Sequence, residues 1–346
     1  MPTVSNIDFT DARWFAADLH VPDRRFGMLR IDDDVIDRSS FLDTRIEAPL
    51  GEAIQVAAAT AATAIAGVPP ATIGWLFHTS FCASTLLARA LHLAPYSVAL
   101  KEPLVLRRLS DARHAGHSID GLVAPVVQLL ARPWHPGGTV LIKPTHVALN
   151  VAAELLAAAP GSRAIILSSA LSDFLISNLK KPPDSQAKIP VLAQRALDAS
   201  GFGARLPAVA AHPPDLVCAA GLQWAAQREL AYQVVDAAGA DRVRLLDMQP
   251  LLGDLTGTVL AAAHWLELGI PDPALAGHAR DVGTRNAKAT AVEYGPERRT
   301  QEAMVVFQQY RDVLIAARSW LETHVLPAMR ADEPPGSPPA TATPRR

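Results

Sequence analysis

Five short and almost uninterrupted apolar runs occur between residues 72 and 250, and longer segments with helical hydrophobic spacing lie between them. Apolar runs without alternation are typical of strands that are buried on both faces, as in parallel sheets. Their alternation with helices predicts a three-layer α/β fold around a central parallel sheet of about five strands. The predicted strands are Ile73–Phe77, Val98–Leu100, Thr139–Ile142, Ala164–Leu167 and Val243–Leu246, and the predicted helices are Leu86–Leu93, Val147–Ala159, Asp173–Lys181, Leu222–Ala238 and Thr256–Leu268.

The two ends of the chain have a different pattern. Residues 1–50 are charged and irregular, and the Ala/Thr-rich run Ala53–Val68 predicts a soluble helix that is too short to span a membrane. We therefore expect residues 1–70 to form an N-terminal extension that packs on a core domain of residues 71–333. Residues 334–346 are rich in Pro, Ser, Thr and Ala, which predicts a disordered tail.

Composition and charge narrow the class of protein. Hydrophobic residues make up 49% of the 346 residues, which is enough for a sizeable core. The 32 basic and 34 acidic residues nearly balance, so there is no general attraction to nucleic acid or to an anionic membrane. The only cysteines, Cys82 and Cys218, cannot form a disulfide framework and suit a reducing cytoplasm. Since no secretory signal is visible, we expect a cytoplasmic protein without a nucleic-acid or membrane partner.

The segment after the first predicted strand has the composition of an anion-binding loop. Thr79–Thr85 is rich in small hydroxyl residues and stands between a strand and a helix start. Backbone N–H groups and hydroxyls at such a position bind phosphate or sulfate. The segment lacks the glycines and the lysine of a Walker A loop. The alternative is that Ser84 and Thr85 only cap the following helix.

The residues Phe77–Leu87, which read Phe-His-Thr-Ser-Phe-Cys-Ala-Ser-Thr-Leu-Leu, resemble the 5′-phosphosulfate loop of sulfotransferases. That loop commonly reads Arg/Lys-Ser-Gly-Thr-Thr before an apolar helix. The resemblance implies a P-loop NTPase-like fold and 3′-phosphoadenylyl sulfate as the donor. Phe81 stands at the basic position and Ala83 at the glycine, so both of these family residues are absent. The residues that would bind the donor here are Thr79, Ser80, Phe81, Cys82, Ala83, Ser84 and Thr85.

Three further positions match the family in part. Its 3′-phosphate motif has an arginine after the next-to-last strand and a serine eight residues later; Ser169 replaces the arginine, and Ser177 matches the serine. Glu102 follows the second strand, where members resembling protein-tyrosine sulfotransferases have a catalytic glutamate that accepts the proton of the acceptor hydroxyl. The alternative is that Glu102 pairs with Lys101 or caps a helix. Lys143 ends the third strand and would stabilise developing charge.

The resemblance implies an enzyme that transfers a sulfuryl group from 3′-phosphoadenylyl sulfate to an unidentified hydroxyl or amine, on a small molecule or a protein, without a metal. In such an enzyme the basic segment Arg280–Arg299 would close over the nucleotide. Replacement of the family's basic residues favours a second hypothesis, a nucleotide- or anion-binding protein without transferase activity. A P-loop kinase-like phosphotransferase is the third, supported only by Asp247 at a strand end.

Overall fold

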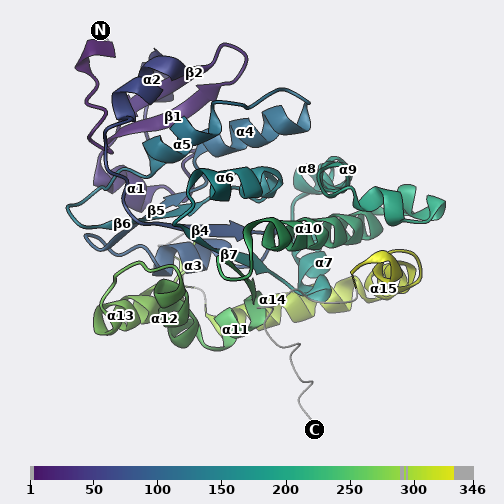
Figure 1. Cartoon of the computed structure of the whole chain (residues 1–346). Helices are drawn as coiled ribbons and strands as arrows, with labels where there is room; N and C mark the ends of the chain where they lie inside the picture. The colour runs from purple at the N-terminus through teal and green to yellow at the C-terminus, as the bar shows by residue number, and fades with distance from the viewer. Residues whose placement is uncertain (1–3, 289–291, 294, 331–346) are drawn as a thin grey trace. The chain divides into compact units, whose positions relative to one another are not determined.

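One parallel sheet organises the chain, as the apolar runs predict. Its strands are β4 (Ile73–His78), β5 (Ser97–Lys101), β6 (Thr139–Lys143), β7 (Arg163–Ser168) and β8 (Val243–Asp247). The computed structural model describes residues 4–288, 292–293 and 295–330, and the strand order in it is β5-β6-β4-β7-β8 (Figure 1). The predicted α/β fold with five parallel strands is therefore confirmed.

Each predicted strand lies inside an observed one, because a strand that is covered on both faces needs apolar side chains at nearly every position. All residues of β4 and of β5 are buried. At Gly74 in β4, an added Cβ would lie 3.1 Å from the side chains of Leu266 and Leu268. The absence of a side chain at Gly74 therefore lets the segment after helix α12 (Leu255–Trp265) approach the strand closely.

The described residues divide into two compact units. The first takes its residues from the ranges 1–77, 84–165 and 254–293. The second takes its residues from the ranges 78–83, 166–253 and 294–346.

The N-terminal part of the first unit has regular secondary structure, although residues 1–50 show an irregular sequence pattern. It forms an antiparallel sheet of β1 (Trp14–His20), β2 (Arg25–Arg30) and β3 (Ile54–Ala57). The charged residues that suggested a loop stand mostly at the strand ends: Arg25 and Arg30 are exposed, and the four residues between them are buried. The run that predicted one helix is β3 followed by α2 (Ala58–Ile65).

Helices cover both faces of the first unit's part of the main sheet (Figure 1). Helices α3, α12 and α13 lie on one face, and α4, α5 and α6 on the other. Their bounds, with that of the short α1, are α1 Asp33–Arg38, α3 Ser84–Ala90, α4 Leu104–His114, α5 Val123–Leu130, α6 Ala152–Ala158 and α13 Asp272–Gly283.

The second unit is built around the 23-residue helix α10 (Leu216–Ala238). Asp215 caps it by accepting hydrogen bonds from the N–H groups of Val217 and Cys218. Burial raises the pKa of the Cys218 thiol to about 12, so this cysteine is an inert core residue. The other helices of the unit are α7 (Leu171–Leu179), α8 (Pro183–Gln186), α9 (Ile189–Ser200), α11 (Met248–Gly253), α14 (Pro296–Gln309) and α15 (Arg311–His324).

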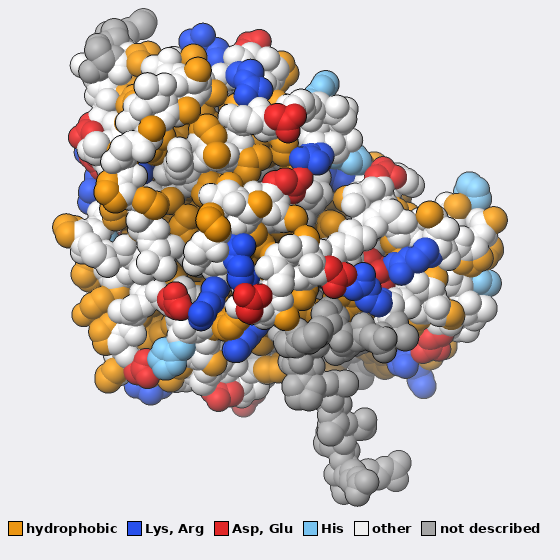
Figure 2. All heavy atoms as spheres, viewed as in Figure 1, with side chains coloured by type: hydrophobic (Ala, Val, Ile, Leu, Met, Phe, Trp, Pro, Cys, Tyr) orange, Lys and Arg blue, Asp and Glu red, His pale blue; other side chains and the backbone are white. Residues whose placement is uncertain are grey.

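On the face drawn in Figure 2, basic and acidic side chains are interspersed. None of the helices in the described ranges has the length and hydropathy of a membrane span. The same part of the chain holds no group of three or more His, Cys, Asp or Glu side chains placed to bind a metal. The predicted tail of residues 334–346 lies outside the described residues.

Candidate functional site

The loop between β4 and α3 is held in a tight conformation by hydrogen bonds within the second unit. The N–H of Thr79 donates to the carbonyl of Leu167 in β7, at 2.9 Å. The carbonyl of Thr79 accepts from the Cys82 thiol at 3.1 Å, so this thiol closes the loop. The N–H of Ser80 donates to Oε1 of Gln227 in α10, at 3.2 Å. The loop is thus fixed beside the carboxyl end of β7.

Three hydroxyls of this region are buried without a protein partner. Thr79 is 1% exposed, Ser80 7% and Ser169 0%, and their hydroxyl oxygens make no hydrogen bond to any residue that the structure describes. The backbone of Thr79 lies beside the segment that holds Ser169, because the Thr79 N–H donates to the carbonyl of Leu167, two residues before Ser169. A buried hydroxyl without a partner costs about 1–3 kcal/mol. Such a cluster is the expected signature of a site for a ligand with several oxygen acceptors.

Strained backbone is concentrated at the predicted site residues. Five non-glycine residues of the described chain have a positive φ, and three of them are Phe81 (59°), Ala83 (60°) and Glu102 (58°). L-residues adopt this region at a cost, and such strain clusters at binding and catalytic sites. Ala83 stands where the resemblance places a glycine, and its backbone has the conformation that favours glycine.

Replacing Ala83 with Gly is expected to raise the free energy of unfolding by roughly 0.5–1 kcal/mol. Left-handed backbone costs an L-residue about 1–2 kcal/mol, and glycine removes this cost. Glycine also raises the conformational entropy of the unfolded chain, which offsets part of the stabilisation. Urea unfolding of the variant measures the difference. The matched control is Ala88→Gly inside α3, which should lower the same free energy by about 1 kcal/mol. A destabilised Ala83→Gly variant would contradict the assignment of strain.

Phe81 of the loop contacts side chains of another segment. The Phe81 ring packs edge-on against Phe174, with ring centroids 5.4 Å apart. The Nζ of Lys181 lies 5.2 Å from the centroid of the same ring. The neighbouring Lys180 is instead neutralised by Glu302, at 3.1 Å. The Lys181 ammonium is thereby held against the loop, from a residue that the sequence analysis did not select.

A second cation lies beside the predicted 3′-phosphate position. The Nη1 of Arg228 in α10 is 3.5 Å from Oγ of Ser168, and its guanidinium stacks over Trp224. The Trp224 indole donates to the carbonyl of Ser169 at 2.8 Å, which fixes this residue. Ser177 is half-buried on α7. A guanidinium is thus present next to Ser169, although the chain has no arginine at that position.

In the first unit, the structure brings the two predicted catalytic residues together. The Nζ of Lys143 is 2.6 Å from Oε1 of Glu102, and the two side chains are 1% and 12% exposed. Burial alone would raise the pKa of Glu102, but the Lys143 charge and hydrogen bond outweigh it, and the pKa lies below its ordinary value. Lys101, the alternative partner, donates instead to the carbonyl of Ile36 at 2.7 Å, and burial lowers its pKa to about 7.

The N-terminal segment adds residues to this pair that sequence analysis missed. Nη2 of Arg45 lies 3.8 Å from Oε2 of Glu102, and its guanidinium covers the Phe41 ring at 3.8 Å. The Lys143 ammonium lies 5.9 Å from the centroid of that ring. His146, at the start of a 3-10 helix after β6, also lowers the pKa of Glu102 through its charge. The N-terminal extension is therefore part of the candidate catalytic site.

The remaining predicted residues have simpler places. Ser84 and Thr85 are buried in the first turn of α3. The Asp247 carboxylate accepts the N–H of Gln249 at 2.8 Å, at the start of α11, as expected of a helix-start residue. The residues of the predicted basic segment lie on several elements. Arg280 is on α13, and Arg298 and Arg299 are on α14. Arg285 forms an isolated antiparallel β-bridge with Glu293, and the Lys288 ammonium lies 5.7 Å from the centroid of the Phe41 ring.

The solved structures that are similar to this chain include two sulfotransferases. A sulfotransferase from Alicyclobacillus acidocaldarius is 14% identical, with a TM-score of 0.36 over 75% of this chain and 99% of that chain. The sulfotransferase domain from the curacin biosynthetic pathway is 13% identical, with a TM-score of 0.38 over 60% of this chain and 77% of that chain. No family model and no curated protein matches the sequence.

Proposed function

We propose that the protein is a sulfotransferase-like transferase that uses 3′-phosphoadenylyl sulfate and a hydroxyl or amine acceptor. The observation that supports this best is the cluster of buried, unpartnered hydroxyls of Thr79, Ser80 and Ser169. Phosphate and sulfate oxygens accept hydrogen bonds from such hydroxyls. The loop sequence resembles the family at the same place, so the residues and the geometry support one ligand.

The two cations of the second unit fit the two charged ends of this donor. In the proposal, Lys181 neutralises the phosphosulfate at the loop, in place of the basic residue that Phe81 replaces. Arg228 neutralises the 3′-phosphate beside Ser169, in place of the arginine that the chain lacks. Both cations are half-buried, and each is held over an aromatic ring, so little side-chain freedom is lost on binding.

The proposed chemistry assigns Glu102 as the base. The acceptor atom forms a bond to sulfur while its proton passes to the Glu102 carboxylate. The bond from sulfur to the bridging phosphate oxygen breaks, and adenosine 3′,5′-bisphosphate leaves with the electron pair. The lowered pKa keeps Glu102 ionised at neutral pH, as a base must be. Lys143 then stabilises the charge that develops during transfer.

The non-catalytic hypothesis is favoured by the ion pair itself. Glu102 and Lys143 neutralise each other at 2.6 Å, and a carboxylate with a lowered pKa is a weaker proton acceptor. In that case the loop would bind a nucleotide or a simple anion without transfer. Turnover, rather than binding, separates the two functions.

Calorimetric titration with adenosine 3′,5′-bisphosphate tests the binding site. The Lys181→Gln variant is expected to bind about 10–100-fold more weakly, because a hydrogen bond to a charged group contributes about 1.5–3 kcal/mol. Lys180→Gln is the matched control, since its ammonium pairs with Glu302, and its affinity should not change. Removing the hydroxyls of Ser80 and Ser169 together should also weaken binding.

Failure to bind the bisphosphate would contradict the proposed donor. ATP with magnesium serves as the second probe in the same titration. Preference for ATP and magnesium over the bisphosphate would favour the kinase-like hypothesis.

A further inference from the structure

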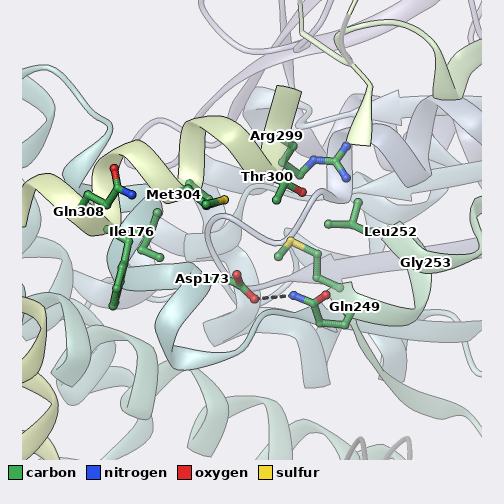
Figure 3. Close-up of a pocket in the computed structure, with 12 residues that line it drawn as sticks. Asp173, Ile176, Gln249, Leu252, Gly253, Arg299, Thr300, Met304 and Gln308 are labelled. Carbon is green, nitrogen blue, oxygen red and sulfur yellow. Dashed lines mark hydrogen bonds between the residues drawn. The ribbon is translucent and has the colours of Figure 1, made fainter. Parts of the chain in front are cut away.

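A pocket of about 520 Å³ lies within the second unit, and its lining includes neither Lys181 and Arg228 nor the loop residues Thr79–Thr85 (Figure 3). Its walls come from α7, α11 and α14. Ile176, Leu252 and Met304 provide apolar surface, and Asp173 and Gln249 are polar residues of α7 and α11. The polar side chains from α14 are Arg299, Thr300 and Gln308. The volume is typical of sites for small organic ligands, which are largely apolar with a few fixed polar groups. We call it the α7–α14 pocket.

The carboxylate of this pocket is fixed and has no cationic partner. Oδ2 of Asp173 accepts a hydrogen bond from Nε2 of Gln249 at 2.7 Å (Figure 3). No ion pair of Asp173 with a cationic side chain is found among the residues that the structure describes. Burial raises its pKa, and the nearby charge of Asp247 adds to this effect. A desolvated carboxylate of this kind is stabilised by a cation that binds next to it.

The apolar wall is partly exposed although it faces the pocket. Met304 is 56% exposed and Phe307 is 44% exposed, and both line the cavity on α14. Exposed large apolar side chains around a concave site mark a surface that a ligand covers. The methionine adapts to ligands of different shape, because its side chain is flexible and polarisable.

We infer that the α7–α14 pocket binds a ligand with a protonated amine on an apolar body. The ammonium lies at Asp173, and the apolar body covers Ile176, Leu252, Met304 and Phe307. The inference is independent of the proposed function. The binding itself needs neither the donor nor turnover.

Three probes of the same shape test the inference by calorimetric titration. They are 4-phenylbutylamine, 4-phenyl-1-butanol and 4-phenylbutyrate, which are cationic, neutral and anionic at neutral pH. The amine is expected to bind the full-length protein at least tenfold more tightly than the alcohol, and the carboxylate more weakly than both. Asp173→Asn should reduce the affinity for the amine to that for the alcohol and leave the alcohol unchanged.

Two variants serve as controls for this test. Asp184→Asn removes an exposed carboxylate of the same unit outside the pocket, and it should change no affinity. Ala303→Phe fills the pocket and should weaken the amine and the alcohol alike. If Asp173→Asn fails to fold, the inference is still tested by the order of the three affinities on the unmodified protein and by the affinities of Ala303→Phe.

Three results would overturn the inference. One is that none of the probes binds, another is that the carboxylate binds as well as the amine, and the third is an unchanged affinity for the amine in Asp173→Asn. Adenosine 3′,5′-bisphosphate is titrated into the same variants. Absence of amine binding by the unmodified protein, with normal bisphosphate binding, refutes only the pocket, and the reverse result refutes only the proposed donor.

Discussion

Replacing Glu102 with Gln is expected to lower the turnover of sulfuryl transfer by roughly 10²–10⁴-fold, with little change in affinity for adenosine 3′,5′-bisphosphate. Glutamine keeps the size of the side chain and an oxygen that still accepts from Lys143, but it cannot take a proton. The measurement compares kcat, KM and bisphosphate affinity of the two proteins. Equal turnover would refute the assignment of Glu102 as the base.

The pH dependence of turnover separates Glu102 from its neighbour His146. The pKa of Glu102 is lowered, so a reaction that depends on this carboxylate should lose activity only below the ordinary glutamate pKa of about 4.3. An imidazole base would lose activity near pH 6.5, where free histidine titrates. The control is His146→Gln: on the proposed mechanism it keeps most of the turnover and the acid limb stays where it was.

The sheet could be predicted from the sequence because its signal is local. A strand that is buried on both faces must be apolar throughout, so its limits are visible in the residues themselves. The N-terminal sheet has no such signal. Arg25 and Arg30 flank only four buried residues in β2, and pairing with β1 and β3, rather than composition, makes this segment a strand.

The candidate sites show the same limit. Thr79, Ser80 and Ser169 could be selected because residues after parallel strands meet at one edge of the sheet. Lys181 and Arg45 could not, because each depends on the tertiary contact that brings it to Phe81 or to Glu102. Charge that a motif has lost can be supplied by any element that packs nearby. A degenerate motif is therefore weak evidence against a site until the neighbouring helices are known.

Replacing Lys143 with Met is expected to lower the free energy of unfolding by about 3–5 kcal/mol, because it leaves the buried carboxylate of Glu102 without its main partner. Methionine keeps the length and the apolar stem of the side chain, so little packing is lost. Urea unfolding measures the change, and hydrogen exchange at β5 and β6 confirms that it arises in the first unit.

A double-mutant cycle decides whether this cost comes from the pair. Lys143→Met combined with Glu102→Gln removes both charges, so it should recover most of the stability that Lys143→Met loses. Arg45→Met is the matched control: Arg45 also faces Glu102, but it is 57% exposed, and its loss should cost no more than about 1 kcal/mol. If Lys143→Met costs as little as Arg45→Met, the carboxylate is solvated in the folded protein. The ion pair with Lys143 would then contribute little, and the assignment of Glu102 as a buried catalytic base would fail.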